Sequence, residues 1–307
     1  METELMRIVR QKQRTIEKFV ALSLLPRSIF RSIRTTSHFK QWHKVPMNYV
    51  RIIELPLTWY LLEPDQKHKI LDISSPKLLS LFLSANNYNN LTISDISDYF
   101  VKDFEKYAKK FAISPEIAVF DAKSIPYPEN TFDRVFSVSV LEHVPDTGDM
   151  EIVKDVARVL KPGGIFVITL PAYENYLEEW LKNTKISWPT VTNSQGESFF
   201  QRRYDETAIE KRFENLGLEI KDIIYIAEKP IKKPQINDQG LLLHNVYYLE
   251  DLSLSQSLNK IYKKFNNTLP FVPYISHRYC SQQYHYLTRD AHDTNIRQVG
   301  IKFQKFS

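Results

Sequence analysis

Residues 70–79 have the sequence ILDISSPKLL, and this stretch decides the fold class. Ile70–Ile73 is a short apolar run typical of a buried strand, and Asp72 places an acid near its end. Ser75 and Pro76 are typical of an N-cap followed by the first residue of a helix. A strand that turns directly into a helix opens a βαβ unit, so we expect parallel strands joined by right-handed crossovers.

The alternation of strands and helices continues along the chain. The later segments predicted to be strands are 91–96, 117–120, 132–140, 165–170, 218–226 and 299–303. The segments predicted to be helices are 98–110, 149–160 and a stretch between Asp205, its N-cap, and Gly217. This order predicts an α/β fold with an open, doubly wound and mostly parallel sheet of seven strands. Two segments, 171–203 and 231–295, break the alternation, and we expect them to be irregular insertions above the sheet.

The composition excludes several classes of site. The chain has only seven glycines and the first is Gly148, so residues 1–147 hold no phosphate-binding P-loop and no GxGxxG fingerprint. The single cysteine, Cys280, excludes an internal disulfide and a CxxC site, which favours a reducing compartment. The eight histidines form no HExxH motif and no close cluster with ligand spacing, so we expect no metal site.

The positive charge is concentrated in residues 1–50. They carry ten Lys and Arg residues against three Glu, which is +7, so the remaining 257 residues carry −2 of the total of +5. Residues 19–25 are the longest apolar run of this arm, and seven residues are too few to span a bilayer, which needs about 20. We therefore expect residues 1–50 to be a basic helical arm of the mature protein in the cytoplasm.

Acids stand at or near the ends of three successive predicted strands, at Asp72, Asp95 and Asp121. Ligands of open α/β sheets bind at the carboxyl ends of the strands, and an acid after the second strand usually binds ribose hydroxyls. The 23 residues from Asp72 to Asp95 are about what one helix and its turns require. This pattern predicts a nucleoside site at the carboxyl edge of the sheet.

Five short motifs in order carry a resemblance to a known family. They are ILDISS at 70–75, SDIS at 94–97, FDAKSIPYP at 120–128, NTFD at 130–133 with VLEHV at 140–144, and LKPGG at 160–164. In order and spacing they resemble the class I S-adenosylmethionine (SAM)-dependent methyltransferases, in particular the type 11 group. The resemblance covers roughly residues 50–230 plus the final strand. It implies a Rossmann-like sheet in which residues 299–303 lie antiparallel beside the sixth strand.

The resemblance also implies which residues bind the cofactor, SAM. Asp72 would hold the methionine amino group, directly or through water, and Asp95 the ribose hydroxyls. Asp121 would accept from the exocyclic amine of adenine, with the backbone amide of Ala122 beside the ring. The methionine and sulfonium end would be lined by Ser137 and Val138.

One motif departs from the family pattern. The family has Gly-x-Gly after the first strand, where this chain has Ser74, Ser75, Pro76 and Lys77. In one interpretation the two serine hydroxyls and the helix N-terminus receive the methionine carboxylate, and Lys77 adds a charge. In the other, the loop has closed and the domain is a catalytically inert binding or scaffold protein. We expect the first, because the acids after the later strands are all present in register.

Glu142 and His143 follow the fourth strand, and the resemblance implies that they face the place of the methyl acceptor. If the acceptor is a hydroxyl, a base is needed, and His143 is the first candidate and Tyr173 the second. The expected acceptor is a small molecule or a lipid-linked compound. Nucleic acid is not expected, because residues 137–140 lack the Asn/Asp-Pro-Pro-aromatic turn of enzymes that methylate base nitrogens.

The chain is expected to divide into four parts. They are the basic arm or cap (1–50), the methyltransferase core (51–230), an aromatic-rich insertion or lid (231–295) and the final strand of the core (296–307). Residues 1–45 carry apolar stripes on what we predict to be two helices broken near Pro26. A cap over the SAM site is the first interpretation of these residues, and peripheral contact with an anionic membrane is the second.

Overall fold

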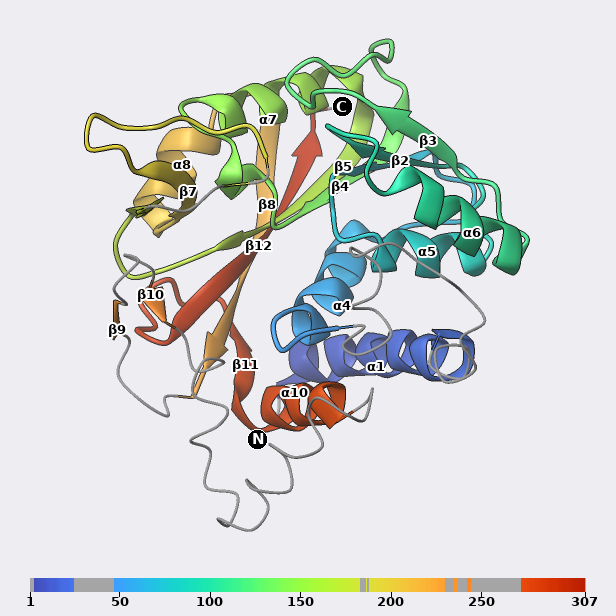
Figure 1. The fold of residues 1–307 in the computed structure, drawn as a ribbon, viewed down its shortest axis with the longest axis horizontal. Coiled ribbons are helices and arrows are strands. Elements are labelled where there is room, and N and C mark those ends of the chain that lie inside the picture. Colours follow the sequence, from blue (N-terminus) through green and yellow to red (C-terminus); the bar gives the residue numbers. More distant parts are fainter. Residues whose placement is uncertain are drawn as a thin grey trace.

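The computed structural model describes residues 3–24, 47–182, 186, 188–229, 235–236, 242–243 and 272–306. An eight-stranded sheet runs through the molecule in the order β11-β8-β12-β5-β4-β1-β2-β3 (Figure 1). Its strands are β1 (Ile70–Ile73), β2 (Leu91–Asp95), β3 (Glu116–Val119), β4 (Phe132–Val138), β5 (Leu160–Pro171), β8 (Leu218–Glu228), β11 (His285–Thr288) and β12 (Ile296–Lys305).

The pairing of the strands confirms the predicted doubly wound sheet. Strands β3, β2, β1, β4 and β5 are parallel to one another. Strand β12 lies between β5 and β8 and is antiparallel to both, as the resemblance implies for the final strand. The expected number of seven strands is one too low, because β11 adds an antiparallel strand beside β8. This strand has only four residues, and its sequence HYLT has no apolar run that would predict it.

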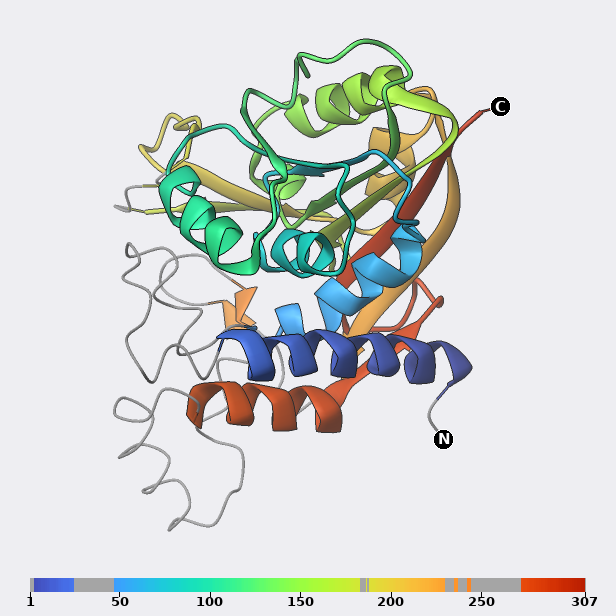
Figure 2. The ribbon, with the colours of Figure 1, turned by 90° about the vertical axis from the view of Figure 1, so that its right-hand side faces the viewer.

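Helices cover both faces of the sheet. They are α1 (Glu4–Phe19), α4 (Arg51–Leu62), α5 (Leu78–Ala85), α6 (Val101–Phe111), α7 (Gly148–Val159), α8 (Glu206–Phe213) and α10 (Val272–Tyr284), with a π-helical turn η1 (Val20–Leu24) and a 3₁₀ turn η3 (Leu141–His143). One hydrophobic cluster joins one face of the sheet to α1, α4, α5 and α6, and a second joins the other face to α7 and α8 (Figures 1 and 2). Adjacent residues Ile70 and Leu71 belong to opposite clusters, because successive side chains of a strand point to opposite faces.

The first helix of the predicted arm is part of the core. Helix α1 lies beside α10 in both views (Figures 1 and 2), and Arg10 Nη2 donates to the carbonyl of Ser281 at 2.6 Å. Val9 and Ile16 of α1 are completely buried in the cluster that includes α4. The second helix expected near Pro26 lies outside the described residues. Within the part of the chain that the structure describes, no helix is both long and apolar enough to cross a bilayer.

The prediction that 171–203 and 231–295 are irregular is wrong for the described residues of both segments. In the first, strands β6 (Leu177–Leu181) and β7 (Ser198–Arg203) form an antiparallel pair. In the second, β9 (Gln235–Ile236) pairs with β10 (Leu242–Leu243), and helix α10 is followed by β11, which lies in the main sheet. Strand β7 ends in Gln201, Arg202 and Arg203, which are nevertheless buried. Gln201 donates to Glu179, Arg203 forms an ion pair with the same carboxylate, and Arg202 donates to two loop carbonyls. Because these three residues are polar, the sequence of β7 lacks the apolar pattern that would predict a buried strand.

The burial of α1 predicts a large stability loss from a single truncation. Ile16→Ala should lower the free energy of unfolding by about 2–5 kcal/mol, because it leaves a cavity under α1. Leu22→Ala is the matched control, since Leu22 is 67% exposed, and it should change stability by less than about 0.5 kcal/mol. Urea denaturation followed by circular dichroism measures both. Equal stability of the two variants would contradict the place of α1 in the core.

Candidate active site

The predicted nucleoside-binding residues lie along one edge of the sheet. Strands β1, β2, β3 and β4 are parallel, so their carboxyl ends meet at that edge. Asp95 is the last residue of β2, and its carbonyl accepts from Phe120 N at 3.0 Å, just after β3. The fold therefore brings Asp95 close to the segment that carries Asp121 and Ala122.

Asp72 is completely buried and holds the turn between β1 and α5. Its Oδ1 accepts from Ser75 N at 3.0 Å, and its Oδ2 accepts from the hydroxyl of Ser80. Burial raises the pKa of Asp72, while Lys77 and the serine hydrogen bonds act in the opposite direction. The expectation that Ser75 and Pro76 start the helix is wrong, because α5 begins at Leu78 with Lys77 as its cap residue.

Side chains replace glycine in this turn. Ser74 has a φ of 53°, in the left-handed region that favours glycine, and its N–H donates to Ser94 O at 3.0 Å. The hydroxyl of Ser75 accepts from Val138 N at 3.0 Å. Ser137 Oγ donates to Ile73 O at 2.9 Å. The turn is thereby tied to β2 on one side and to β4 on the other.

The structure brings Lys77 to the predicted ribose carboxylate. Its Nζ donates to Ser94 O at 2.9 Å, lies 3.2 Å from Asp95 Oδ2 and is 4.6 Å from the centre of the Phe100 ring. The hydroxyl of Tyr99 also donates to Asp95 Oδ2, at 3.3 Å. Lys77 is only 3% exposed and Asp95 only 6%, so this is a buried ion pair.

Asp121 and Ala122 form the open end of the same edge. The Oδ1 of Asp121 accepts from Lys123 N at 3.0 Å, and Lys123 Nζ lies 3.6 Å from its Oδ2. Both side chains of this pair are about half exposed, at 40% for Lys123 and 46% for Asp121. A ligand atom can reach the carboxylate of Asp121 from solvent.

A second polar group, which the sequence analysis missed, joins α4 to the ends of β4 and β5. Glu54 Oε1 accepts from Ser139 Oγ and from Thr169 Oγ1, both at 2.6 Å. Arg51 pairs with the other oxygen of Glu54 and donates to Ser139 Oγ at 2.7 Å. Glu54 is completely buried. The available signal was a single carboxylate inside the apolar run Ile52–Leu55, since a charge there must find partners in the core.

Glu142 and His143 form a neutral acid–imidazole pair next to this group. Burial raises the pKa of Glu142 to about 8, and the charge of Glu54 adds to the shift, so Glu142 keeps its proton at neutral pH. His143 Nδ1 lies 2.7 Å from the carbonyl of Phe200, which can only accept, so Nδ1 carries the proton and Nε2 has a free lone pair. Burial lowers the pKa of His143, and Nε2 lies 3.8 Å from Glu142 Oε1.

Aromatic rings flank His143. The ring centres of Trp188 and Phe200 lie 4.7 Å and 5.3 Å from that of His143. Two buried polar atoms here, Glu142 Oε2 and Trp188 Nε1, have no hydrogen-bond partner among the residues that the structure describes. Buried polar atoms are normally paired, so these two mark a place for a ligand or for water. None of the described contacts joins Tyr173, the second candidate base, to His143.

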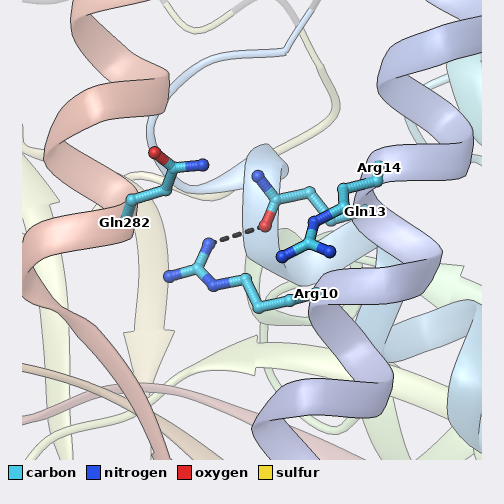
Figure 3. Close-up of a pocket in the computed structure, with 4 residues that line it drawn as sticks. All are labelled: Arg10, Gln13, Arg14 and Gln282. Carbon is cyan, nitrogen blue, oxygen red and sulfur yellow. Dashed lines mark hydrogen bonds between the residues drawn. The ribbon is translucent and has the colours of Figure 1, made fainter. Parts of the chain in front are cut away.

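A separate cavity of about 170 Å³ lies between α1 and α10 (Figure 3). It is lined by Arg10, Gln13, Arg14 and Gln282, and Arg10 Nη1 donates to Gln13 Oε1 at 2.6 Å. None of the predicted site residues lines this cavity.

Comparison with known proteins finds one matching family model and several relatives of similar sequence. Residues 71–168 match the family model described as "Methyltransferase domain". A sterol 24-C-methyltransferase of Pneumocystis carinii (strain B80) is 30% identical over 92 residues, which are 29% of this chain and 22% of that protein. The ubiquinone/menaquinone biosynthesis C-methyltransferase UbiE of Rickettsia akari (strain Hartford) is 30% identical over 129 residues, which are 39% of this chain and 51% of that protein. The chain thus spans about half or less of the length of these curated relatives.

Among solved structures, a geranyl diphosphate C-methyltransferase of Streptomyces coelicolor A3(2) aligns with a TM-score of 0.49 and 12% identity. The alignment covers 83% of this chain and 77% of that one.

The raised pKa of Glu142 predicts a pH-dependent stability. The folded chain holds this proton up to a pH of about 8, whereas an unfolded Glu releases it near 4.5, so the contribution is present in full below pH 4.5 and is lost as the pH rises to 8. Glu142→Gln removes the titration. Relative to this variant, the wild type should lose stability by up to about 1.4 kcal/mol per pH unit in that window.

Urea denaturation at pH 5, 6.5 and 8 measures this difference. Glu105→Gln, at an exposed position of α6, is the control and should follow the wild type at every pH. Parallel pH profiles of the wild type and Glu142→Gln would contradict a buried neutral Glu142.

Proposed function

The core of this chain belongs to the type 11 group of class I SAM-dependent methyltransferases, and we propose that the chain transfers a methyl group from SAM to a small-molecule or lipid-linked acceptor. The observation that carries the proposal is the arrangement of the carboxyl edge within the matched residues. There the ends of β1, β2 and β4 and the segment after β3 hold the residues that the resemblance assigns to the cofactor.

The residues of the edge fit the nucleoside half of SAM. Asp95 would hold the ribose hydroxyls, and Asp121 with the Ala122 amide would hold adenine. In support of this, Asp95 and the segment before Asp121 are joined by the bond from Phe120 N. Asp121 is open to solvent, as an adenine contact requires. Asp95 Oδ2 becomes available to a ribose hydroxyl when Lys77 moves away from it.

At the methionine end, the turn after β1 supplies the remaining residues. Both carboxylate oxygens of Asp72 are used within the chain, so we propose that Asp72 shapes the turn and reaches the amino group through water. Ser74, Ser75 and Lys77 would receive the carboxylate, and the last residues of β4, Ser137 and Val138, would line the sulfonium end. Lys77 is the only cation among these residues.

The chemistry requires mainly positioning. Bound SAM supplies an electrophilic methyl group, so the chain has to hold an acceptor in line with it and exclude water. For a hydroxyl acceptor, His143 Nε2 would take the proton as the new bond to carbon forms, because its other nitrogen is already protonated. Protonated Glu142 would donate a hydrogen bond to the acceptor from Oε2, which has no partner among the described residues.

The walls of this site suit a flat apolar acceptor. Trp188 and Phe200 present aromatic rings beside His143. Relatives named for sterol and for ubiquinone and menaquinone biosynthesis support a small lipophilic molecule.

For residues 1–45 we propose a cap, in keeping with the contact between α1 and α4, the helix that carries Arg51 and Glu54. Peripheral membrane contact, and with it a membrane-associated place in the cytoplasm, is the second proposal and rests on the basic charge of the arm. The four-part division of the chain also stays a proposal, with β11 of the proposed lid lying in the sheet.

One observation favours a second candidate, a catalytically inert binding or scaffold protein. Lys77 forms an ion pair with Asp95, and both carboxylate oxygens of Asp72 accept hydrogen bonds within the chain, so the edge is closed by its own side chains at the ends of β1 and β2. Isothermal titration separates the two candidates, because an inert scaffold would give no heat with millimolar SAM.

Asp95→Ala should weaken SAM binding by more than about tenfold, because it leaves the ribose hydroxyls without their acceptor. Isothermal titration with SAM and with S-adenosylhomocysteine measures the loss. Asp98→Ala, three residues further along the chain and exposed, is the matched control and should bind like the wild type. Unchanged affinity in Asp95→Ala would contradict the proposed ribose contact.

His143→Gln should lower methyl transfer by at least about 100-fold for a hydroxyl acceptor, because the variant lacks a base. Binding of S-adenosylhomocysteine should stay unchanged. Methyl-labelled SAM with a panel of hydroquinones and sterols, followed by organic extraction, measures the transfer. If His143→Gln methylates a member of the panel at the same rate as the wild type, His143 is not the base.

A further inference from the structure

We infer that Lys77 is an exchange residue that makes the nucleoside site selective for ligands with a carboxylate. Its ammonium holds Asp95 until a nucleoside takes its place, and it then pairs with a carboxylate at the other end of the ligand. The inference rests on the proposed function, since it places ribose at Asp95.

The ammonium of Lys77 is buried against the carboxylate of Asp95. Within the described part of the chain, Lys77 Nζ contacts Ser94 O at 2.9 Å, Asp95 Oδ2 at 3.2 Å and the Phe100 ring at 4.6 Å. With 3% exposure, the side chain has left almost all of its water. An ammonium buried in this way needs a counter-charge, and Asp95 is the carboxylate that it contacts.

The second step follows from what ribose requires. A ribose diol donates two hydrogen bonds to a carboxylate, and Asp95 Oδ2 already forms an ion pair with Lys77 and accepts from the hydroxyl of Tyr99. A neutral diol that displaces Lys77 takes from a buried ammonium the carboxylate that it contacts, which is unfavourable. The other carboxylate that acts on Lys77, Asp72, already accepts from Ser75 N and from the hydroxyl of Ser80. A ligand that also brings a carboxylate supplies a new charge-assisted partner, so the cost is offset within the same complex.

The backbone around Lys77 is fixed by hydrogen bonds, so only the side chain of Lys77 can move from Asp95 to the carboxylate of a ligand. Ser74 N is bonded to Ser94 O, and Ser75 Oγ is bonded to Val138 N, so the backbone before Lys77 is fixed on two sides. After it, Leu81 N donates to the carbonyl of Lys77 at 2.9 Å, in the first turn of α5. The flexible four-carbon stem of lysine is therefore the part that can move. The turn faces the methionine end of the proposed ligand, so the ammonium can reach a carboxylate there.

Lys77→Met tests the inference by removing the charge and keeping a similar length. In this variant Asp95 is free to accept from ribose, so adenosine should bind at least tenfold more tightly than to the wild type. The ratio of S-adenosylhomocysteine affinity to adenosine affinity should fall at least tenfold, because the ligand carboxylate loses its cation. Isothermal titration with both ligands measures the four affinities. Lys123→Met removes a half-exposed lysine from the neighbouring pair with Asp121, and as the control it should keep the wild-type ratio.

The wild type gives a second measurement that does not depend on the folding of the variant. It should bind S-adenosylhomocysteine at least tenfold more tightly than 5′-methylthioadenosine, which has the same nucleoside and no carboxylate. Equal affinities would overturn the inference.

The outcomes for the inference and for the proposed function differ. If the wild type binds neither ligand and Lys77→Met binds adenosine, Lys77 blocks the site as inferred and the proposed methyltransferase function falls. If the wild type binds S-adenosylhomocysteine and Lys77→Met has the wild-type ratio, the proposed function stands and the inference is overturned. If neither protein binds either ligand, both are overturned.

Discussion

The buried carboxylate of Asp72 holds a turn that contains no glycine, and the rest of the site depends on this turn. Ser74 adopts a left-handed conformation that costs a residue with a side chain about 1–2 kcal/mol. The hydrogen bonds from Ser75 and Ser80 to Asp72 fix the turn against that strain. They also fix the point where α5 begins, and so the direction in which the Lys77 side chain leaves the backbone.

The same edge buries four carboxylates, and each is stabilised in a different way. Glu54 has the guanidinium of Arg51 and two hydroxyls, Asp72 has one N–H and one hydroxyl, and Asp95 has the ammonium of Lys77. Glu142 has none of these and is stable because burial keeps it protonated. The edge therefore holds carboxylates that accept from fixed donors beside a carboxyl group that keeps its own proton and can donate it.

The sequence predicted the parts of this structure that follow from local patterns. The parallel strands and the helices between them follow from apolar runs and caps, and the edge position of Asp95 follows from the order of strands. Strand β7 could not be predicted, because Arg202 and Arg203 are buried only through partners on other segments. The bond between Thr169 and Glu54 spans 115 residues, so no local pattern contains it.

The contact of Lys77 with Asp95 could not be predicted from the sequence, for a different reason. A lysine in the first turn of a helix is usually solvated, and its direction here is set by the conformation of Ser74 and by side-chain torsions. The family pattern places glycine in this turn, so the resemblance offered no precedent for a side chain at that place.

The position of β12 has a consequence for how the chain folds during synthesis. Strands β5 and β8 do not pair with each other, because β12 lies between them along its whole length. Until residues 296–305 leave the ribosome, both strands present an unpaired edge rich in apolar residues, the kind of edge that pairs with other chains. The sheet therefore closes only after residues 296–305 have been made, and until then β5 and β8 can pair with strands of other chains.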